Sequence, residues 1–348
     1  MMTMKQWEMT GIGREQLVLC ERPIPVPGPR DVLVKVRAVA LNHRDKMVIE
    51  SGRGLPLQFP FTPGSDLAGE VISLGEATDR FSVGDRVISC FTPEWIDGTR
   101  PGTGRIPAYR TLGGFYPGVL AEYVVLSQEW LTAAPATLDD AHACTLPCAG
   151  VTAWFALAER GRVRAGETVL ILGTGGVALF GLMFAKLQGA EVIVSTVPDK
   201  VDRVRALGAD QIVDRNRTDW LDDIYALTDN RGVDHILETV GGNHLGCSVE
   251  AAAIGGHIYQ IGALAGFDIS SPVMPLLMKD VTIHGIATGH RRALENMVRA
   301  IDRNHAVPVI DSRFSLASLP LALDRLDNGP FGKIVIELPD EVRCQENF

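Results

Sequence analysis

The segment ALNHRDKM at positions 40–47 places four polar residues in succession after an apolar run: Asn42, His43, Arg44 and Asp45. An imidazole can bind a metal ion or carry a proton, and a carboxylate can act as a base or cap a helix. Amide and guanidinium groups donate hydrogen bonds to negatively charged oxygens. The segment therefore allows three interpretations: a metal site, a proton-transfer site, or a loop held by its own side chains.

A second candidate site is the glycine-rich segment TVLILGTGGVA at residues 168–178. A buried strand there is expected to turn at Gly173, Gly175 and Gly176 into a helix that begins near Val177. Glycine lets the backbone approach a pyrophosphate closely, while a helix N-terminus offers free N–H groups and partial positive charge. Glycine turns also serve as plain connections, so the surrounding elements decide what this turn means.

The next strand ends in VIVSTVPDK, where NAD-preferring sites usually carry an acid that binds the ribose. Ser195 occupies the expected place of that acid, and Lys200 and Arg203 follow closely. A site without this carboxylate does not repel a 2′-phosphate, and nearby cations attract one. We therefore expect NADP as cofactor, with NAD possible. In the alternative interpretation, the two cations only form a solvated helix face.

The elements that must position these residues change character along the chain. Residues 1–130 are rich in Pro, Gly and short strand-like runs, which predicts a small β-barrel or sandwich. Residues 166–287 alternate apolar strands with helices, which predicts a doubly wound parallel sheet of Rossmann type.

The tail beyond residue 290 is expected to pack back onto the first domain, because the parallel sheet already has six strands. We therefore predict an α/β protein with two domains. Residues 1–149 and 290–348 form the catalytic domain, and residues 150–289 form the dinucleotide-binding Rossmann domain.

Composition limits the classes of partner. The 348 residues carry a net charge of −9, which argues against a large nucleic-acid-binding face, since phosphate neutralisation needs clustered Lys and Arg. No signal-peptide core and no apolar run of about 18 residues is present. The six cysteines are scattered without a CxxC pair, which favours reduced thiols. We expect a cytoplasmic protein that acts on a small molecule, away from membranes and nucleic acids.

With these elements in order, nearly the whole chain resembles the medium-chain dehydrogenase/reductase superfamily. The matching segments are PGSDLAGEVISLG, FSVGDRVIS, GVLAEYVVLS, LPCAGVTAW, the glycine turn, GVDHILETVGG and FGKIVIEL. The resemblance implies a chaperonin-10-like barrel completed by the C-terminal tail, an inserted Rossmann domain and a homodimer joined through the last Rossmann strand.

The metal positions of the superfamily can be checked in this sequence. Its zinc-dependent members carry Cys where this chain has Asn42, His followed by an acid where it has Ser65 and Asp66, and Cys or Asp near Cys148. Only Cys148 is a good zinc ligand of these types. Residues 91–126, where a four-cysteine structural zinc lobe would fall, contain no cysteine. We expect no zinc and assign the chain to the zinc-free, quinone oxidoreductase-like branch.

In that branch, the resemblance places Asn42 near the nicotinamide, lets Asp45 brace the loop, and puts His43 at the cofactor pyrophosphate. Arg44 stands where alcohol dehydrogenases keep a Ser or Thr that relays a proton, which disfavours simple alcohol oxidation. The other cofactor contacts implied by the resemblance are Thr152, Gly241, Ile261 and Gly262 around the nicotinamide and its ribose, and Lys333 at the pyrophosphate.

Without zinc, a plain ketone is poorly polarised, whereas an enone or quinone spreads the charge of an added hydride onto an oxygen. The Asn42 amide could stabilise that oxygen. We predict a zinc-independent transfer of hydride from NAD(P)H to a conjugated carbonyl or quinone. Two alternatives stay open: an NAD(P)-dependent alcohol or aldehyde dehydrogenase, and a non-catalytic nucleotide-binding protein. The aromatic-rich insertion at residues 91–116 either covers the substrate or packs on the barrel.

Overall fold

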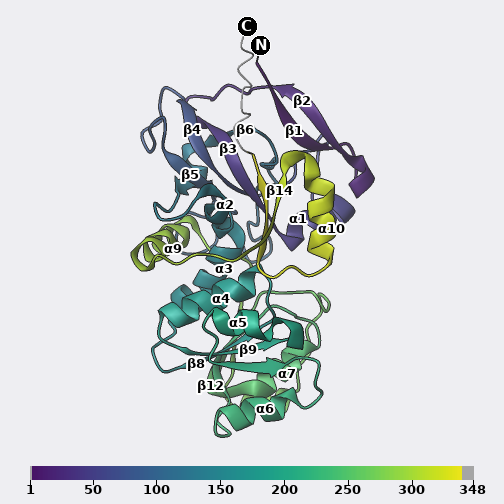
Figure 1. Cartoon of the computed structure of the whole chain (residues 1–348), viewed down its shortest axis with the longest axis vertical. Helices are drawn as coiled ribbons and strands as arrows, with labels where there is room; N and C mark the ends of the chain where they lie inside the picture. The colour runs from purple at the N-terminus through teal and green to yellow at the C-terminus, as the bar shows by residue number, and fades with distance from the viewer. Residues whose placement is uncertain (1, 339–348) are drawn as a thin grey trace. The chain divides into compact units, whose positions relative to one another are not determined.

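The computed structural model describes residues 2–338, which divide into two compact units. Of the described residues, the first unit contains 2–147, 310–328 and 333–338. The second contains residues 148–309 and 329–332. In Figure 1 the yellow C-terminal elements β14 and α10 lie beside the purple N-terminal strands within the first unit.

The first unit is built on a seven-stranded sheet and a separate hairpin. In the sheet, β14 (Ile310–Ser315), β15 (Lys333–Glu337), β3 (Asp31–Leu41), β4 (Asp66–Leu74), β5 (Arg86–Ser89) and β7 (Leu131–Ala133) follow one another, and β6 (Tyr123–Ser127) also pairs with β3. The hairpin consists of β1 (Thr3–Met9) and β2 (Leu17–Pro23). The strands predicted from the short apolar runs before residue 130 are present; the hairpin was not predicted.

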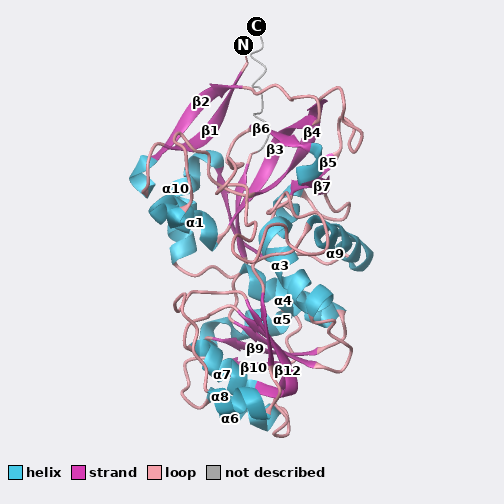
Figure 2. Cartoon of the chain, turned by 180° about the vertical axis from the view of Figure 1, so that it is seen from behind, coloured by secondary structure: helices cyan, strands magenta, loops and turns pink. Residues whose placement is uncertain are grey.

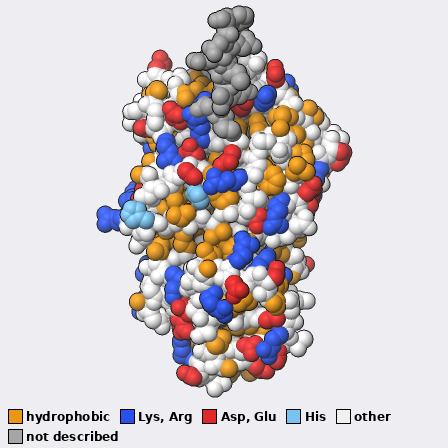
Figure 3. Space-filling view, in the orientation of Figure 1, with side chains coloured by type: hydrophobic (Ala, Val, Ile, Leu, Met, Phe, Trp, Pro, Cys, Tyr) orange, Lys and Arg blue, Asp and Glu red, His pale blue; other side chains and the backbone are white. Residues whose placement is uncertain are grey.

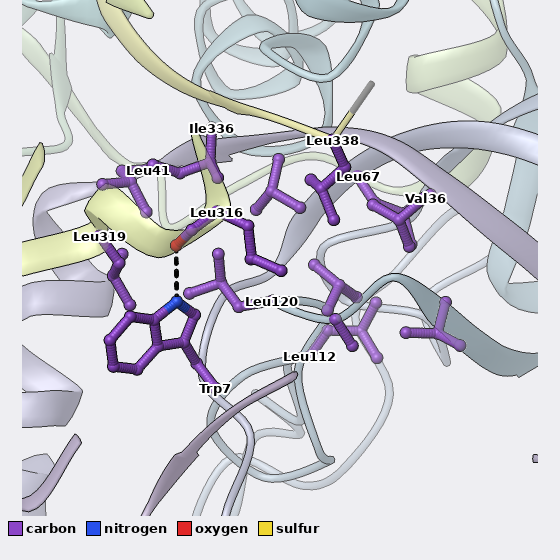
Figure 4. Close-up of a cluster of buried hydrophobic side chains, with 14 of the residues drawn as sticks. Trp7, Val36, Leu41, Leu67, Leu112, Leu120, Leu316, Leu319, Ile336 and Leu338 are labelled. Atoms are coloured by element: carbon purple, nitrogen blue, oxygen red, sulfur yellow. Dashed lines mark hydrogen bonds between the residues drawn. The ribbon is translucent and has the colours of Figure 1, made fainter. Parts of the chain in front are cut away.

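A buried apolar cluster ties the tail of the chain to its beginning in the first unit. The Trp7 indole N–H donates a hydrogen bond of 2.7 Å to the carbonyl of Leu316, as Figure 4 shows. Leu316 opens the 3-10 turn before α10 (Leu319–Asp327), and Leu319 and Ile336 are buried in the same cluster. Burial of each such side chain contributes about 1.5–3 kcal/mol, so the tail is an integral part of this unit.

The second unit is a doubly wound parallel sheet, as predicted. Its strands follow the order β10 (Gln211–Asp214), β9 (Glu191–Thr196), β8 (Thr168–Leu172), β11 (Val233–Glu238), β12 (Ala252–Gln260) and β13 (Thr282–Gly285). The helices between them are α4 (Gly176–Leu187), α5 (Val201–Ala206), α6 (Trp220–Leu227), α7 (His244–Ala251) and α8 (Val273–Met278), which Figure 2 shows around the strands. The order reverses between β8 and β11, and open sheets of this type bind ligands at the carboxyl ends of the strands beside such a switch.

One predicted domain boundary differs from the structure. Helix α9 (Arg291–Asn304) belongs to the second unit, although residues 290–348 were assigned to the first domain. Its apolar face is buried, the Asn296 amide donates a 3.0 Å hydrogen bond to Glu159, and the His290 ring packs edge-on against Phe155. The helix pattern was read correctly, but an amphipathic pattern does not say which neighbour buries the apolar face.

The remaining helices are α1 (His43–Ser51), α2 (Asp140–Ala143) and α3 (Val151–Trp154), with π-helical turns at Leu146–Gly150 and Phe155–Arg160. Within the described residues, no helix is long and apolar enough to span a membrane. Figure 3 shows cationic and anionic side chains interspersed over the visible face of these residues.

Candidate active site

Asn42 is the N-cap residue of α1, at the turn that leads out of strand β3. The Asp45 carboxylate accepts a hydrogen bond from the Asn42 backbone N–H over 2.8 Å. In return, the Asp45 N–H donates to the Asn42 carbonyl over 2.9 Å. Asp45 thus occupies the N3 position of the helix and satisfies a backbone donor that would otherwise lack a partner. The Asn42 side chain remains available for other contacts.

The Asn42 side-chain amide lies in a chain of buried polar groups. The Lys333 ammonium donates to Asn42 Oδ1 over 2.5 Å and to the Leu41 carbonyl over 2.7 Å. Asn42 Nδ2 donates to Ser65 Oγ over 3.3 Å, and Ser65 Oγ donates to Asp66 Oδ1 over 2.6 Å. Asn42, Ser65, Asp66 and Lys333 are all less than a tenth exposed.

Strand register explains why these distant residues meet. β15, β3 and β4 are neighbours in the sheet, with Ile334 opposite Leu41 and Ala40 opposite Asp66. The first residue of β15 therefore lies beside the end of β3, and the first residue of β4 lies on the other side of the same strand end. Lys333, which the family resemblance puts at a cofactor pyrophosphate, donates hydrogen bonds to the Leu41 carbonyl and to Asn42 Oδ1, and its contact with a cofactor stays a prediction. A buried ammonium needs acceptors close by, and it finds them at this strand end.

Asp45 is completely buried, and its Oδ1 atom has no hydrogen-bond partner among the described residues. Burial, and next the charge of Asp66, raise the pKa of Asp45 to about 6, against the opposing charges of Arg44 and Lys333. This carboxyl group therefore titrates close to neutral pH.

Arg44 anchors the aromatic-rich insertion at residues 91–116. Its guanidinium donates to the Thr111 hydroxyl and, over 3.3 Å, to the Gly113 carbonyl, and it lies 5.2 Å from the centre of the Phe91 ring. Phe91 is buried, so the insertion packs on the first unit at this point. Its side chains Ile106, Tyr109 and Phe115 are exposed.

His43 is the exposed member of the Asn42–Asp45 segment. Partial desolvation of the ring and the nearby charge of Lys46 lower its pKa, so the imidazole is neutral at pH 7. Among the described residues no hydrogen bond engages this ring, which leaves its nitrogens open to a ligand.

In the second unit, the glycine turn leads from β8 into the twelve-residue helix α4. Gly173 has a φ of 86°, a conformation that favours glycine, and Gly175 is the exposed N-cap residue. A Cβ atom at Gly175 would meet no atom within 4 Å, so the backbone faces open space there. Gly176 and Val177 form the first, half-buried turn of the helix. This arrangement suits a pyrophosphate, because the helix N-terminus directs its free N–H groups into that space.

The end of β9 lies beside this turn. The Gly173 N–H donates to the Ser195 carbonyl over 2.8 Å, and Ser195 is buried. The Lys200 ammonium donates to the Gly329 carbonyl over 3.3 Å, and the Arg203 guanidinium lies 3.8 Å from the centre of the Phe331 ring. Both predicted cations are therefore held against residues 329–332.

A third cation, not predicted from the sequence, lies at this edge of the sheet. The Arg215 N–H donates to the Thr196 carbonyl over 3.0 Å, which places the exposed Arg215 directly after β10, the neighbour of β9. Strand β10 ends at Asp214, directly before Arg215. The signal was therefore present, since carboxyl ends of adjacent parallel strands meet at one edge.

The carboxyl ends of β11 and β12 bring Gly241, Ile261 and Gly262 together. A Cβ atom at Gly262 would lie 1.7 Å from the Thr239 carbonyl oxygen, and one at Gly241 would lie 2.4 Å from the Gly262 carbonyl oxygen. Only glycine therefore fits at either position. Thr152 is buried in α3, which packs against α4 in the same unit.

Glu238 organises the turn before Gly241 and was not identified from the sequence. Its buried carboxylate accepts hydrogen bonds from the backbone N–H groups of Val240 and Gly241, from the His244 ring and from the Ser248 hydroxyl. Burial alone would raise the pKa of Glu238, but hydrogen bonds from His244 and Ser248 outweigh it and lower the pKa. The carboxylate is thus ionised and fixes the loop that carries Gly241.

The residues at the predicted metal positions of the first unit do not fit zinc. Zinc in proteins is bound by thiolate, imidazole or carboxylate groups. The Asn42 amide and the Ser65 hydroxyl are instead hydrogen-bonded to each other, and the Lys333 ammonium lies 2.5 Å from Asn42 Oδ1. A fixed positive charge there would repel a divalent cation.

Comparison with known proteins supports the predicted fold. The zinc-binding dehydrogenase family matches residues 176–303, and the alcohol dehydrogenase GroES-like domain matches residues 28–136. A zinc-type alcohol dehydrogenase-like protein of Schizosaccharomyces pombe is 34% identical over 94% of this chain and 96% of its own length. The quinone oxidoreductase of Rattus norvegicus is 26% identical, covering 90% and 91%. A crystal structure from Sinorhizobium meliloti, provisionally named an alcohol dehydrogenase, has 55% identity and a TM-score of 0.95, covering 97% of this chain and 100% of that one.

Proposed function

Because the chain belongs to the medium-chain dehydrogenase/reductase superfamily, a family of oxidoreductases, we propose that it reduces a conjugated carbonyl or quinone with NADPH and without zinc. The observation that supports this proposal most is the buried row of hydrogen bonds from Lys333 through Asn42 to Ser65. It puts an ammonium and an amide where the superfamily resemblance places a metal site.

When bound, the nicotinamide supplies the hydride. Reduction of an enone or quinone places negative charge on a substrate oxygen, and the task left to this chain is to stabilise that charge. An N–H donor held in a buried site does this effectively, because it needs no reorganisation as the charge develops. The Asn42 side chain is such a donor, and water can supply the proton that completes the reduction.

The preference for NADPH rests on the charges at the ends of β9 and β10. Ser195 stands where an acid would bind an unphosphorylated ribose, and Lys200, Arg203 and Arg215 are gathered at the same edge. A phosphate carries up to two negative charges and accepts strong hydrogen bonds from such cations.

An alcohol dehydrogenase reaction with NAD is the second candidate, and the names of several relatives favour it. Arg44 argues against it. The resemblance puts a proton-relaying hydroxyl at this position, and here the guanidinium holds the insertion through Thr111 and Gly113.

A panel of acceptors and donors tests the proposal. The protein is incubated with NADPH or NADH and a set of quinones and enones, and separately with NADP⁺ or NAD⁺ and simple alcohols. We expect loss of NADPH absorbance with enones or quinones and no reduction of NADP⁺ by alcohols. Alcohol oxidation as the sole activity would overturn the proposal. Tight dinucleotide binding without turnover of any substrate would favour a non-catalytic nucleotide-binding protein.

A further inference from the structure

We infer that Lys333 is a positioning residue whose buried ammonium fixes the orientation of the Asn42 amide, so that an amide N–H is presented to the substrate oxygen. This inference rests on the proposed reduction of a conjugated carbonyl or quinone. It also gives Lys333 a role different from the pyrophosphate contact that the sequence suggested.

The orientation of the amide follows from hydrogen-bond chemistry. A lysine ammonium has three donors and no acceptor, so the Asn42 atom that faces it at 2.5 Å must be the carbonyl oxygen. The NH₂ group is then forced to the opposite side. An asparagine without such a neighbour could turn either its oxygen or its nitrogen toward a ligand.

The groups beyond Asn42 reinforce this direction. Ser65 Oγ uses its single proton to donate to Asp66, so it can only accept from Asn42 Nδ2. All donors in the chain from Lys333 to Asp66 therefore point the same way. Asn42 Nδ2 carries a second N–H, which makes no hydrogen bond within residues 2–338. That N–H is free to donate to a ligand.

The charge of Lys333 also strengthens the donor. A cation bonded to the carbonyl oxygen of an amide polarises the amide and makes its N–H groups more acidic donors. The same charge also acts on the neighbouring Asp45, where it opposes the rise of the carboxyl pKa. Lys333 thus acts on the substrate oxygen through Asn42.

A double-mutant cycle distinguishes this role from a purely structural tie between β15 and β3. Lys333→Met keeps the apolar stem and removes the charge, Asn42→Ala removes the amide, and the double variant combines both. We expect Lys333→Met to lower kcat at least about tenfold and to leave the KM for NADPH unchanged. The loss in kcat should be smaller than the loss caused by removal of an oxyanion donor, because the Asn42 amide is still present. In the Asn42→Ala background, Lys333→Met should change kcat less than about twofold, because the amide through which Lys333 acts is absent.

If the loss of kcat in the double variant equals the product of the losses in the two single variants, the inference is overturned. A wild-type kcat in Lys333→Met would also overturn it. Lys35→Met, on strand β3, serves as the matched control and should keep wild-type kinetics. Should Lys333→Met fail to fold, Lys333→Gln takes its place, since its amide can still donate to Leu41 without carrying a charge.

A second readout does not depend on turnover. The side-chain ¹⁵N resonance of Asn42, assigned by its absence in Asn42→Ala, should move in Lys333→Met while backbone resonances of the second unit stay in place. An unchanged Asn42 resonance would overturn the inference. If the wild-type protein reduces no enone or quinone, the proposed function fails, and this measurement still decides whether Lys333 orients the amide.

Discussion

Asn42 is the residue on which the proposed chemistry depends most. Its amide has one oxygen bonded to Lys333 and one N–H without a protein partner among the described residues. We predict that Asn42→Ala lowers kcat by about 10²–10³-fold, as for loss of an oxyanion donor, and leaves the Kd of NADPH unchanged. Asn42→Asp should be at least as impaired, because it offers a carboxylate where charge develops. Equal losses in kcat and in NADPH affinity would instead mark Asn42 as a general binding residue.

Asp45 makes the stability of the protein depend on pH in a defined direction. Its pKa is raised to about 6, above the unfolded value, so the folded state holds the proton more tightly. Between about pH 4 and pH 6 stability therefore rises as the pH falls, and above pH 6 the buried charge destabilises the fold by about 3 kcal/mol.

Urea unfolding of wild type and Asp45→Asn tests this prediction. Asp45→Asn keeps an acceptor for the Asn42 N–H and removes the charge. Its advantage in unfolding free energy over wild type should be larger at pH 7.5 than at pH 4.5. A difference that does not vary with pH would contradict the assigned titration.

The cations after β9 and β10 should decide the choice of dinucleotide. We predict that Lys200→Ala and Arg215→Ala each weaken NADPH binding about tenfold or more, the effect of losing a charged hydrogen bond, and leave NADH binding unchanged. Arg164→Ala, an exposed arginine of the same unit, is the control. Fluorescence titration with both dinucleotides measures the effect. An equal loss of affinity for NADH would show that these cations do not bind the 2′-phosphate.

At the scale of elements, the loops at the carboxyl ends of β11 and β12 depend on glycine. A side chain at Gly262 would collide with the Thr239 backbone, whereas one at Gly285 in β13 would meet nothing within 4 Å. We predict that Gly262→Ala destabilises the protein by about 1–3 kcal/mol and weakens dinucleotide binding. Gly285→Ala should stay within about 0.5 kcal/mol of wild type. Thermal unfolding measures the stability of the two variants, and fluorescence titration measures their dinucleotide affinity. Equal stability and equal affinity in both variants would contradict the predicted steric clash at Gly262.

Elements were predictable from sequence where one periodic pattern dominated. The alternation of apolar strands and helices from Thr168 to Gly285 predicted the six-stranded sheet. The hairpin β1–β2 and the strand β14 were not predicted, since none of these strands shows a clear alternation of apolar and polar residues. The unit to which α9 belongs was predicted wrongly, because its partner lies far away in sequence.

The candidate site shows the same limit. Asn42, Asp45 and the glycine turn could be selected as candidates because local sequence motifs mark them. The contact of Lys333 with Asn42 depends on the register of β15 against β3, and the role of Glu238 depends on four donors that converge in space. Neither arrangement leaves a local pattern in the sequence.

At the scale of the whole molecule, we expect a homodimer formed through the second unit. Strand β13 is an edge of its sheet, and segment 254–278 exposes eight large apolar side chains: Ile254, Leu264, Phe267, Ile269, Val273, Met274, Leu277 and Met278. Open edges and exposed apolar surface of this kind favour association with a second copy. Light scattering should give twice the chain mass of 37.6 kDa, and Leu277→Lys with Met278→Lys should shift it to the monomer. A monomeric wild type would contradict this expectation.

We propose that an amide held by a buried ammonium takes the place of a metal ion in this protein. The most direct test is the rate of NADPH consumption with an enone or quinone after the protein has been stripped of metal by a strong chelator and its zinc content measured. We expect an unchanged rate in protein that contains no stoichiometric zinc. Loss of the rate on stripping, restored by added zinc, would contradict it.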